Sequence, residues 1–325
     1  MSDITITCYG PRGSLPSPSY KGFSTLVYGG NTSSYHVQAG PFSFFLDLGS
    51  GVSNLGDRLM KSGKGVGKSH ICLLSHWHWD HIQGGPFCVP FFVASNTFHF
   101  HGFAPAGQET ERPLNKTVEL LLSSQQVSPH FPVAHGAMPS NKVYQAHQRQ
   151  FSETFYYVAN DDGTYTFVAD SMACCKRSSM LNQPMPVDRT VKVTTIPLNH
   201  PDGCLGYRIE YMNKVIVYCT DDEPLMFLNK EIVKHAKNAD WLLMDGQYTH
   251  EQLSGMYQTF GHGTPSRCVE TAQACGAKLV VVHHHDPKHD DNKVALMENE
   301  ATLYAADRGY TGKVEFAREG MVWEL

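Results

Sequence analysis

Short apolar runs bounded by turn residues recur along the chain, and each predicts a buried strand. They lie at residues 42–48, 70–74, 191–198, 214–220, 241–244 and 278–282. Segments with helical spacing follow some of these runs, for example at residues 269–274 and 294–306. Because predicted strands and helices intermix along the sequence, the pattern predicts a layered α/β domain.

The stretch from about 96 to 190 breaks this pattern. It is rich in proline, and it holds a helical segment at 116–124 and an Asn-Asp-Asp-Gly hairpin signal at 160–163. We expect it to be an insertion that forms a lid or cap within one domain spanning residues 1–325. The alternating phenylalanines and histidines at 98–101 could line the roof of a pocket under this lid, although such alternation is more often core packing.

Composition narrows the classes of function. The chain has 325 residues, 41% of them hydrophobic, which is enough for a sizeable core. Its net charge of -5 provides no basic field for long nucleic acid, and no apolar run approaches the roughly 20 residues of a membrane span. The N-terminus lacks the pattern of a signal peptide, and nine scattered cysteines are typical of reduced thiols. We therefore expect a cytoplasmic protein with a small-molecule substrate, no long nucleic acid and no membrane contact, and the sequence leaves a homodimer open.

Histidine is the unusual residue type, with 18 in the chain. An H-x-H-x-D-H array, His76 to His81, begins two residues after the end of the predicted strand at 70–74. Alternate residues of an extended segment point the same way, so His76 and His78 can hold one ion while Asp80 and His81 turn toward a neighbouring position. This array predicts a metal site.

Further candidate ligands follow other predicted strands. His200 lies between a strand and a glycine-containing turn, and Asp221 ends a strand at a point where its carboxylate could bridge two cations. A run of three histidines, His283 to His285, follows the last predicted strand, and spacing alone does not choose among its members. Since polar side chains converge at strand ends in open sheets, these residues extend the predicted site to two metals.

The ordered motifs resemble those of the metallo-β-lactamase superfamily over most of the chain. The array His76–His81 looks like the second motif, His200 the third, Asp221 the fourth and the histidine run the fifth, while Asp47 looks like the structural aspartate of the first. The resemblance implies a four-layer αββα sandwich, here with an inserted cap region, and metals at one edge of the sheets.

The resemblance also implies a ligand set. His76, His78 and His200 would hold one metal, Asp80, His81 and a histidine of the fifth motif the second, and Asp221 would bridge both. Similarity to the family's strand-then-histidine pattern favours His284, with His283 and His285 as alternatives. The implied cofactors are two divalent metal ions, with Zn²⁺ expected and Mn²⁺ or iron as alternatives. We also expect Asp47 and Asp245 to brace the ligands.

Other motifs resemble the ribonuclease Z-like, phosphodiesterase-type branch of that superfamily. Residues 10–16 and 28–33 are similar to its N-terminal signature. The segment Gly261-His262-Gly263-Thr264 resembles a Gly-His-Ser-Thr motif whose histidine contacts the scissile phosphate, with Gly263 in place of the serine. By this resemblance Asp80 and His262 are the expected catalytic residues.

The expected activity is hydrolysis of a small phosphodiester, such as a cyclic nucleotide. Two divalent cations would lower the pKa of a bridging water and provide hydroxide near neutral pH. The branch's tRNA-processing members carry a long arm between the third and fourth motifs, whereas only twenty residues separate His200 from Asp221, so we do not expect tRNA maturation. The alternatives are an ester, lactone or thioester hydrolase of the same fold, or a non-hydrolytic metal-binding, cofactor-biosynthesis or oxygen-handling protein.

Overall fold

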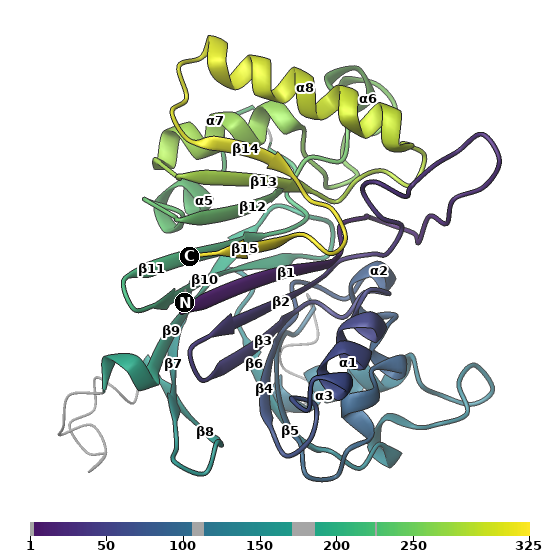
Figure 1. Ribbon diagram of the computed structural model, residues 1–325, viewed down its shortest axis with the longest axis vertical. Coiled ribbons are helices and arrows are strands. Elements are labelled where there is room, and N and C mark those ends of the chain that lie inside the picture. Colours follow the sequence, from purple (N-terminus) through teal and green to yellow (C-terminus); the bar gives the residue numbers. More distant parts are fainter. Residues whose placement is uncertain (1–2, 106–113, 171–185, 225) are drawn as a thin grey trace.

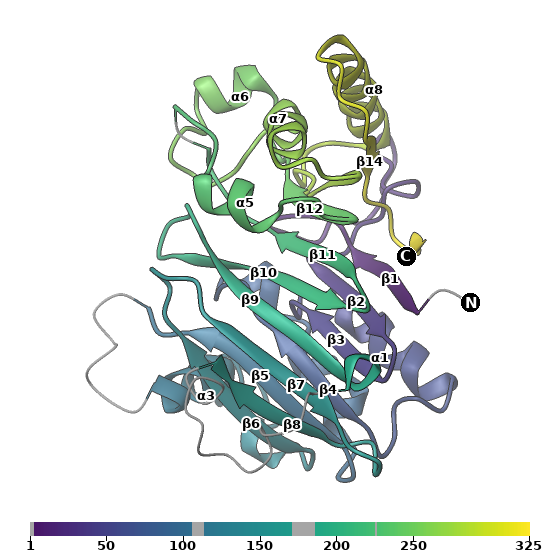
Figure 2. The same cartoon turned by 90° about the vertical axis from the view of Figure 1, so that its left-hand side faces the viewer.

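The computed structural model describes residues 3–105, 114–170, 186–224 and 226–325. Two mixed sheets pack face to face, with helices on both outer sides (Figures 1 and 2). The first sheet has the order β15 (Val322–Glu324), β1 (Ile4–Gly10), β2 (Ser34–Ala39), β3 (Phe42–Leu46), β4 (Ser69–Leu73), β5 (Thr97–Phe103), β6 (Asn141–His147). The second has the order β14 (Lys313–Phe316), β13 (Leu279–His283), β12 (Trp241–Asp245), β11 (Lys214–Cys219), β10 (Cys204–Tyr211), β9 (Thr190–Leu198), β7 (Thr154–Ala159), β8 (Tyr165–Ala169).

The helices divide between the two outer sides. They are α1 (Val52–Lys61), α2 (Trp79–Ile82), α3 (Leu114–Ser124), α5 (Lys230–His235), α6 (His250–Ser254), α7 (Pro265–Cys275) and α8 (Asp291–Asp307). In Figure 1, α1 and α3 cover the outer face of β3 to β5, while α5, α7 and α8 cover that of β12 to β14. Short 3₁₀ turns occur at Gly85–Phe87, Val89–Phe92, His135–Ala137 and Val187–Arg189. The four-layer αββα sandwich is therefore confirmed.

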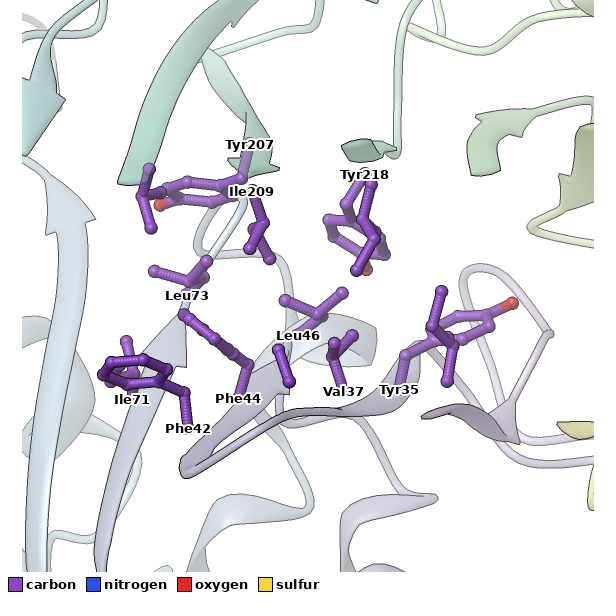
Figure 3. Close-up of a cluster of buried hydrophobic side chains, with 14 of the residues drawn as sticks. Tyr35, Val37, Phe42, Phe44, Leu46, Ile71, Leu73, Tyr207, Ile209 and Tyr218 are labelled. Atoms are coloured by element: carbon purple, nitrogen blue, oxygen red, sulfur yellow. The ribbon is translucent and has the colours of Figure 1, made fainter. Parts of the chain in front are cut away.

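Three hydrophobic clusters fill the three spaces between these layers. The cluster between the sheets joins residues such as Phe44 and Leu73 of the first sheet to Tyr207 and Ile209 of the second, as Figure 3 shows. The other two lie between each sheet and its helices. Strands β3, β4 and β12 are buried along their whole length, which explains why their apolar runs are continuous and not alternating.

Strand β11 shows how these runs divide between the two faces. Ile216 and Tyr218 point into the space between the sheets, whereas Val217 and Cys219 pack under the helices. All six predicted strands correspond to observed strands with ends within two residues, and the helices at 269–274 and 294–306 lie inside α7 and α8. The pattern missed β1, β2 and β10, among other elements.

The segment from 96 to 190 differs from the expected lid. Its strands β5 and β6 extend the first sheet, and β7 and β8, the expected hairpin, extend the second. Its described part is therefore built into both layers of the core, and a separate cap was the wrong interpretation, because proline-rich connections hid ordinary strands. His101 is buried against Phe155 of β7, and Phe98 packs in the cluster under α1 and α3, so residues 98–101 are core and not roof.

Strand directions bring the chemically interesting loops to one edge. Strands β3 and β4 are parallel, as are β11, β12 and β13, and β9 runs in the same direction as β11 because both are antiparallel to β10. The carboxyl ends of these strands therefore meet at the same edge of the sandwich.

Among the described residues, the cysteines are free and buried, and no helix combines the length and apolar character that crossing a bilayer requires.

Candidate metal centre

Loops at the carboxyl ends of four strands carry most of the predicted site residues. The array His76–His81 follows β4, and α2 begins inside it at Trp79, so that Asp80 and His81 lie in the first helical turn. His200 follows β9, Asp221 follows β11, and His284 follows β13. These positions are as much as 208 residues apart in sequence, yet their ligand atoms form compact groups.

The first group consists of His76, His78, His200 and Asp221. Its potential ligand atoms all lie within 4.8 Å of one another. The Nε2 atom of His200 is 3.1 Å from Nδ1 of His78, and Nε2 of His76 is 3.3 Å from Oδ2 of Asp221. All but His78 are buried, so the group is open to solvent on the side of that residue.

The second group consists of Asp80, His81 and His284. The Nε2 atoms of the two histidines lie 3.2 Å apart, and each is 3.2 Å from Oδ2 of Asp80. Asp80 is held further by the backbone N–H of Ser14, which donates to the same oxygen at 2.6 Å. Gly13 makes this approach possible, because a Cβ atom there would collide with the ring of His284.

Asp221 lies between the histidines of the first group and the residues of the second, and one of its carboxylate oxygens faces each set. Its Oδ2 atom faces His76, and its Oδ1 atom lies 3.4 Å from Nε2 of His81 and 3.2 Å from Nε2 of His284. Burial alone would raise the pKa of this carboxyl, but the imidazoles of His284 and His81 hold it well below its usual range. The backbone φ of 29° at Asp221 is rare for a residue with a side chain and marks a position under local constraint.

Asp47 and Ser75 hold two of the candidate ligands, His81 and His76, by hydrogen bonds to their Nδ1 atoms. The Nδ1 atom of His81 donates to Oδ2 of Asp47 at 2.7 Å, and the hydroxyls of Ser75 and Tyr218 donate to the same oxygen. The Ser75 hydroxyl also lies 3.0 Å from Nδ1 of His76. The Nδ1 proton of His81 is thus fixed on Asp47, which leaves Nε2 as the ring nitrogen directed into the site.

Two further acceptors orient the rings of His284 and His200 in the same way. Nδ1 of His284 donates to Oε1 of Gln247 at 2.7 Å, and Nδ1 of His200 donates to the carbonyl of Gly261 at 2.8 Å. The sequence did not reveal Gln247, although its place two residues after the end of β12 was a usable signal. The sequence also did not reveal Ser14, whose N–H holds Asp80, or Glu223, which is described below, as site residues.

The structure distinguishes the three histidines of the run. His283 points between the rings of Tyr35 and Tyr218 in the core, and His285 stacks on Phe316 and donates from Nε2 to the Ala317 carbonyl. His284, with a φ of 64°, is the member of the run that reaches Asp80 and Asp221. A left-handed backbone at this position turns its side chain from the sheet into the site.

His262 lies at the edge of the same site. Its Nδ1 atom donates to Oδ2 of Asp245 at 2.9 Å, and its ring stacks on that of His284 with centroids 4.8 Å apart. Burial disfavours the protonated ring, but the carboxylates of Asp245 and Asp221 outweigh burial and raise the pKa of His262 to about 9. A third compact group, Asp221, Asp245, His262 and His284, overlaps the second group here.

The arrangement of donors fits metal cations. Because the Nδ1 atoms of His81 and His284 already donate to other acceptors, their Nε2 atoms, 3.2 Å apart beside a carboxylate, are the ring nitrogens that can give up a proton and bind a cation. The Nε2 atom of His76 is buried without a hydrogen-bond partner among the described residues. Such a set of imidazole and carboxylate donors is typical of Zn²⁺ and related divalent ions.

Known proteins resemble this chain in sequence and in fold. Residues 159–285 match the model of the beta-lactamase superfamily domain. A ribonuclease Z from Picrophilus torridus is 22% identical over 317 residues, covering 91% of this chain and 90% of the relative. The crystal structure of the metallo-beta-lactamase fold protein YhfI from Bacillus subtilis superimposes with a TM-score of 0.61 at 18% identity, covering all of both chains. Unliganded yeast PDE1 superimposes with a TM-score of 0.59 at 12% identity, also covering all of both chains.

These likenesses agree with the arrangement of the chain itself. The superfamily match ends at His285 and so includes β9 to β13 and the loops that carry His200, Asp221 and His284. The structural likeness extends to the first sheet, which carries the array His76–His81. The chain therefore has the metallo-β-lactamase fold, and its sequence is similar to the beta-lactamase superfamily domain over residues 159–285 and to ribonuclease Z over most of its length.

Proposed function

We propose that the chain hydrolyses a small phosphodiester, such as a cyclic nucleotide, at a two-metal centre. His76, His78 and His200 would hold one cation, Asp80, His81 and His284 the other, and Asp221 would contact both. The observation that carries this proposal is the division of the Asp221 carboxylate, whose two oxygens face different groups of histidines. When bound, two divalent cations lower the pKa of water and offset negative charge on phosphate oxygens.

His262 is the proposed acid. Asp245 fixes its Nδ1 proton, so Nε2 is the ring nitrogen available to a substrate. A protonated ring there can donate a hydrogen bond from Nε2 to a phosphoryl oxygen or a proton to the leaving oxygen. Asp80, held by the Ser14 N–H, is the carboxylate best placed to orient the attacking water.

Two likenesses favour phosphorus over carbon as the reacting centre. The Picrophilus torridus relative bears the name ribonuclease Z, and the yeast neighbour the name PDE1. The ligand groups by themselves serve ester, lactone or thioester hydrolysis equally well, since water activated by cations attacks acyl carbon too. These two likenesses are therefore the reason why we propose a phosphodiester ahead of an ester, lactone or thioester as the substrate.

A panel of substrates assayed on metal-quantified protein tests the proposal. We expect turnover of bis(p-nitrophenyl) phosphate and of at least one cyclic nucleotide, with little turnover of a lactone or a thioester. The His262→Gln variant is expected to retain metal and to lose about 100-fold or more in kcat. Loss of metal in that variant would assign His262 to the ligands, and faster turnover of the lactone or thioester would overturn the choice of phosphodiester.

RNA is a second candidate substrate, favoured by the name of the Picrophilus torridus relative. The net charge of -5 argues against tight binding of a long polyanion. Including a tRNA transcript in the same panel separates the two candidates. Cleavage of the transcript with no turnover of small diesters would replace the first proposal with this one.

A further inference from the structure

We propose that Glu223 is a positioning residue that holds the turn at residues 259–261 against the metal centre. Its side chain is 7% exposed and lies two residues after Asp221. Its Oε1 atom accepts the backbone N–H of Thr259 at 2.9 Å, and its Oε2 atom accepts that of Gly261 at 2.8 Å. One carboxylate thus binds both ends of the turn.

The position of Glu223 is itself fixed by the loop after β9. Its backbone N–H donates to the carbonyl of Asn199 at 2.8 Å, and the side-chain amide of Asn199 donates to the carbonyl of Glu223 at 2.7 Å. The loops that carry His200 and Asp221 are therefore bonded together next to both residues. Glu223 extends this connection to the third loop, which carries His262.

The turn that Glu223 holds contains one residue, Thr259, in an unfavourable backbone conformation. Thr259 has a φ of 73°, which is rare for a β-branched residue. Gly261 has a φ of 92°, and a Cβ atom there would collide with the ring of His200 and with Pro201. Conformations of this kind persist only where surrounding contacts impose them, and hydrogen bonds to a buried carboxylate are among the stronger ones available.

This turn determines the tautomer of His200 and the position of the His262 ring. The Gly261 carbonyl accepts the Nδ1 proton of His200 and so leaves the Nε2 lone pair of that ring free for a cation. His262 is the next residue, and its ring lies between Asp245 and His284. If the turn relaxes, we expect His200 to lose its fixed tautomer and His262 to leave its place.

Amide hydrogen exchange tests the contact directly. In Glu223→Gln, an amide with a single oxygen replaces a carboxylate that accepts from two N–H groups, and Glu223→Ala removes both contacts. We expect exchange in the segment 256–262 to become about tenfold faster or more in both variants, with α6 and α7 unchanged. Glu231→Gln, which removes a half-exposed carboxylate from α5, is the control and should match the wild type.

Activity tests the consequence, and this part rests on the proposed function because it takes His262 as the acid. We expect Glu223→Gln to lose about tenfold or more in kcat on a diester with a poor leaving group. A diester that releases p-nitrophenolate, which needs little protonation, should be affected less. The metal-binding affinity of Glu223→Gln, measured by competition with a chelator, should fall modestly because His200 loses its fixed tautomer.

The outcomes separate the two proposals. If the wild type hydrolyses no diester but exchange accelerates and metal affinity falls in Glu223→Gln, the proposed function fails and the positioning role of Glu223 stands. Wild-type exchange at 256–262 in Glu223→Gln overturns the positioning role. Equal losses of kcat on both diesters, with wild-type metal affinity, overturn it as well.

Discussion

The Nδ1 atom of His81 donates to Oδ2 of Asp47 across 2.7 Å, and both side chains are fully buried. Asp47 has a φ of 57° and also accepts from Ser75 and Tyr218. The carboxylate therefore fixes the tautomer of a proposed ligand from a site where it cannot touch a metal-bound substrate. Changes at Asp47 should alter metal binding before they alter chemistry.

Asp47→Asn tests this relationship. The amide can offer His81 an N–H where an acceptor is needed, so we expect metal affinity to fall by about 10- to 100-fold. Titration with Zn²⁺ against a chromophoric chelator measures the change. Asp240→Asn, at a buried carboxylate that binds Val215 and Lys278 away from the site, should leave the affinity unchanged. Equal affinities in Asp47→Asn and the wild type would contradict the role.

The pair His284→Ala and His285→Ala separates binding from packing. His284 faces Asp80 and Asp221, so its removal should abolish binding of at least one metal ion while leaving a folded chain. His285 stacks on Phe316 in the core, so its removal should lower the free energy of unfolding by about 2–4 kcal/mol without changing metal stoichiometry. Metal analysis and urea unfolding of both variants make the comparison, and a reversed pattern would show that the wrong histidine was chosen.

Removal of metal should destabilise the whole sandwich. The proposed ligands come from loops of both sheets, with His76 to His81 after β4 and His200 and Asp221 after β9 and β11. Each ion present at 100 times its Kd adds about 2.7 kcal/mol to the stability of the folded state. We therefore expect chelation to lower the thermal midpoint by at least about 5 °C and metal restoration to reverse the change. An unchanged midpoint would mean that the cations do not join the two layers.

Arg12 should be sensitive to the shape of its side chain. It is fully buried, and its guanidinium donates to the carbonyls of Gly29, Asp286 and His289. Lysine keeps the charge, but its ammonium group cannot donate hydrogen bonds in the same three directions. Arg12→Lys should therefore lower the free energy of unfolding by about 1.5–3 kcal/mol. Arg318→Lys, at a half-exposed arginine paired with Glu298, should cost less than about 1 kcal/mol. A smaller loss at Arg12 than at Arg318 would refute this reasoning.

The site residues that could be predicted from the sequence are those that are adjacent in the chain or directly follow a recognisable strand. His76 to His81 form one continuous array, and His200 and Asp221 each follow a strand whose apolar run is clear in the sequence. Since parallel strands bring their carboxyl ends to one edge, these residues could be expected to meet. The choice of His284 depended on family likeness, because three adjacent histidines give no periodic signal of their own.

The remaining contacts depend on tertiary placement. Gln247 reaches His284, and Glu223 reaches Thr259 and Gly261, across long stretches of sequence that no pattern connects. Histidine and phenylalanine alternate along strand β5, which left both a pocket roof and core packing open, and the buried strand shows that core packing is correct. The proline-rich segment around it concealed strands in the same way.

The central claim is that Asp221 joins two groups of ligands around a pair of cations. Its most direct test is the number of divalent metal ions bound per folded chain, measured by elemental analysis of the wild type and of Asp221→Ala after equilibration with Zn²⁺. We expect about two ions for the wild type and a loss of both in the variant, with the fold retained as judged by circular dichroism. A wild type that binds no ion, or an Asp221→Ala variant that keeps both, would contradict this claim.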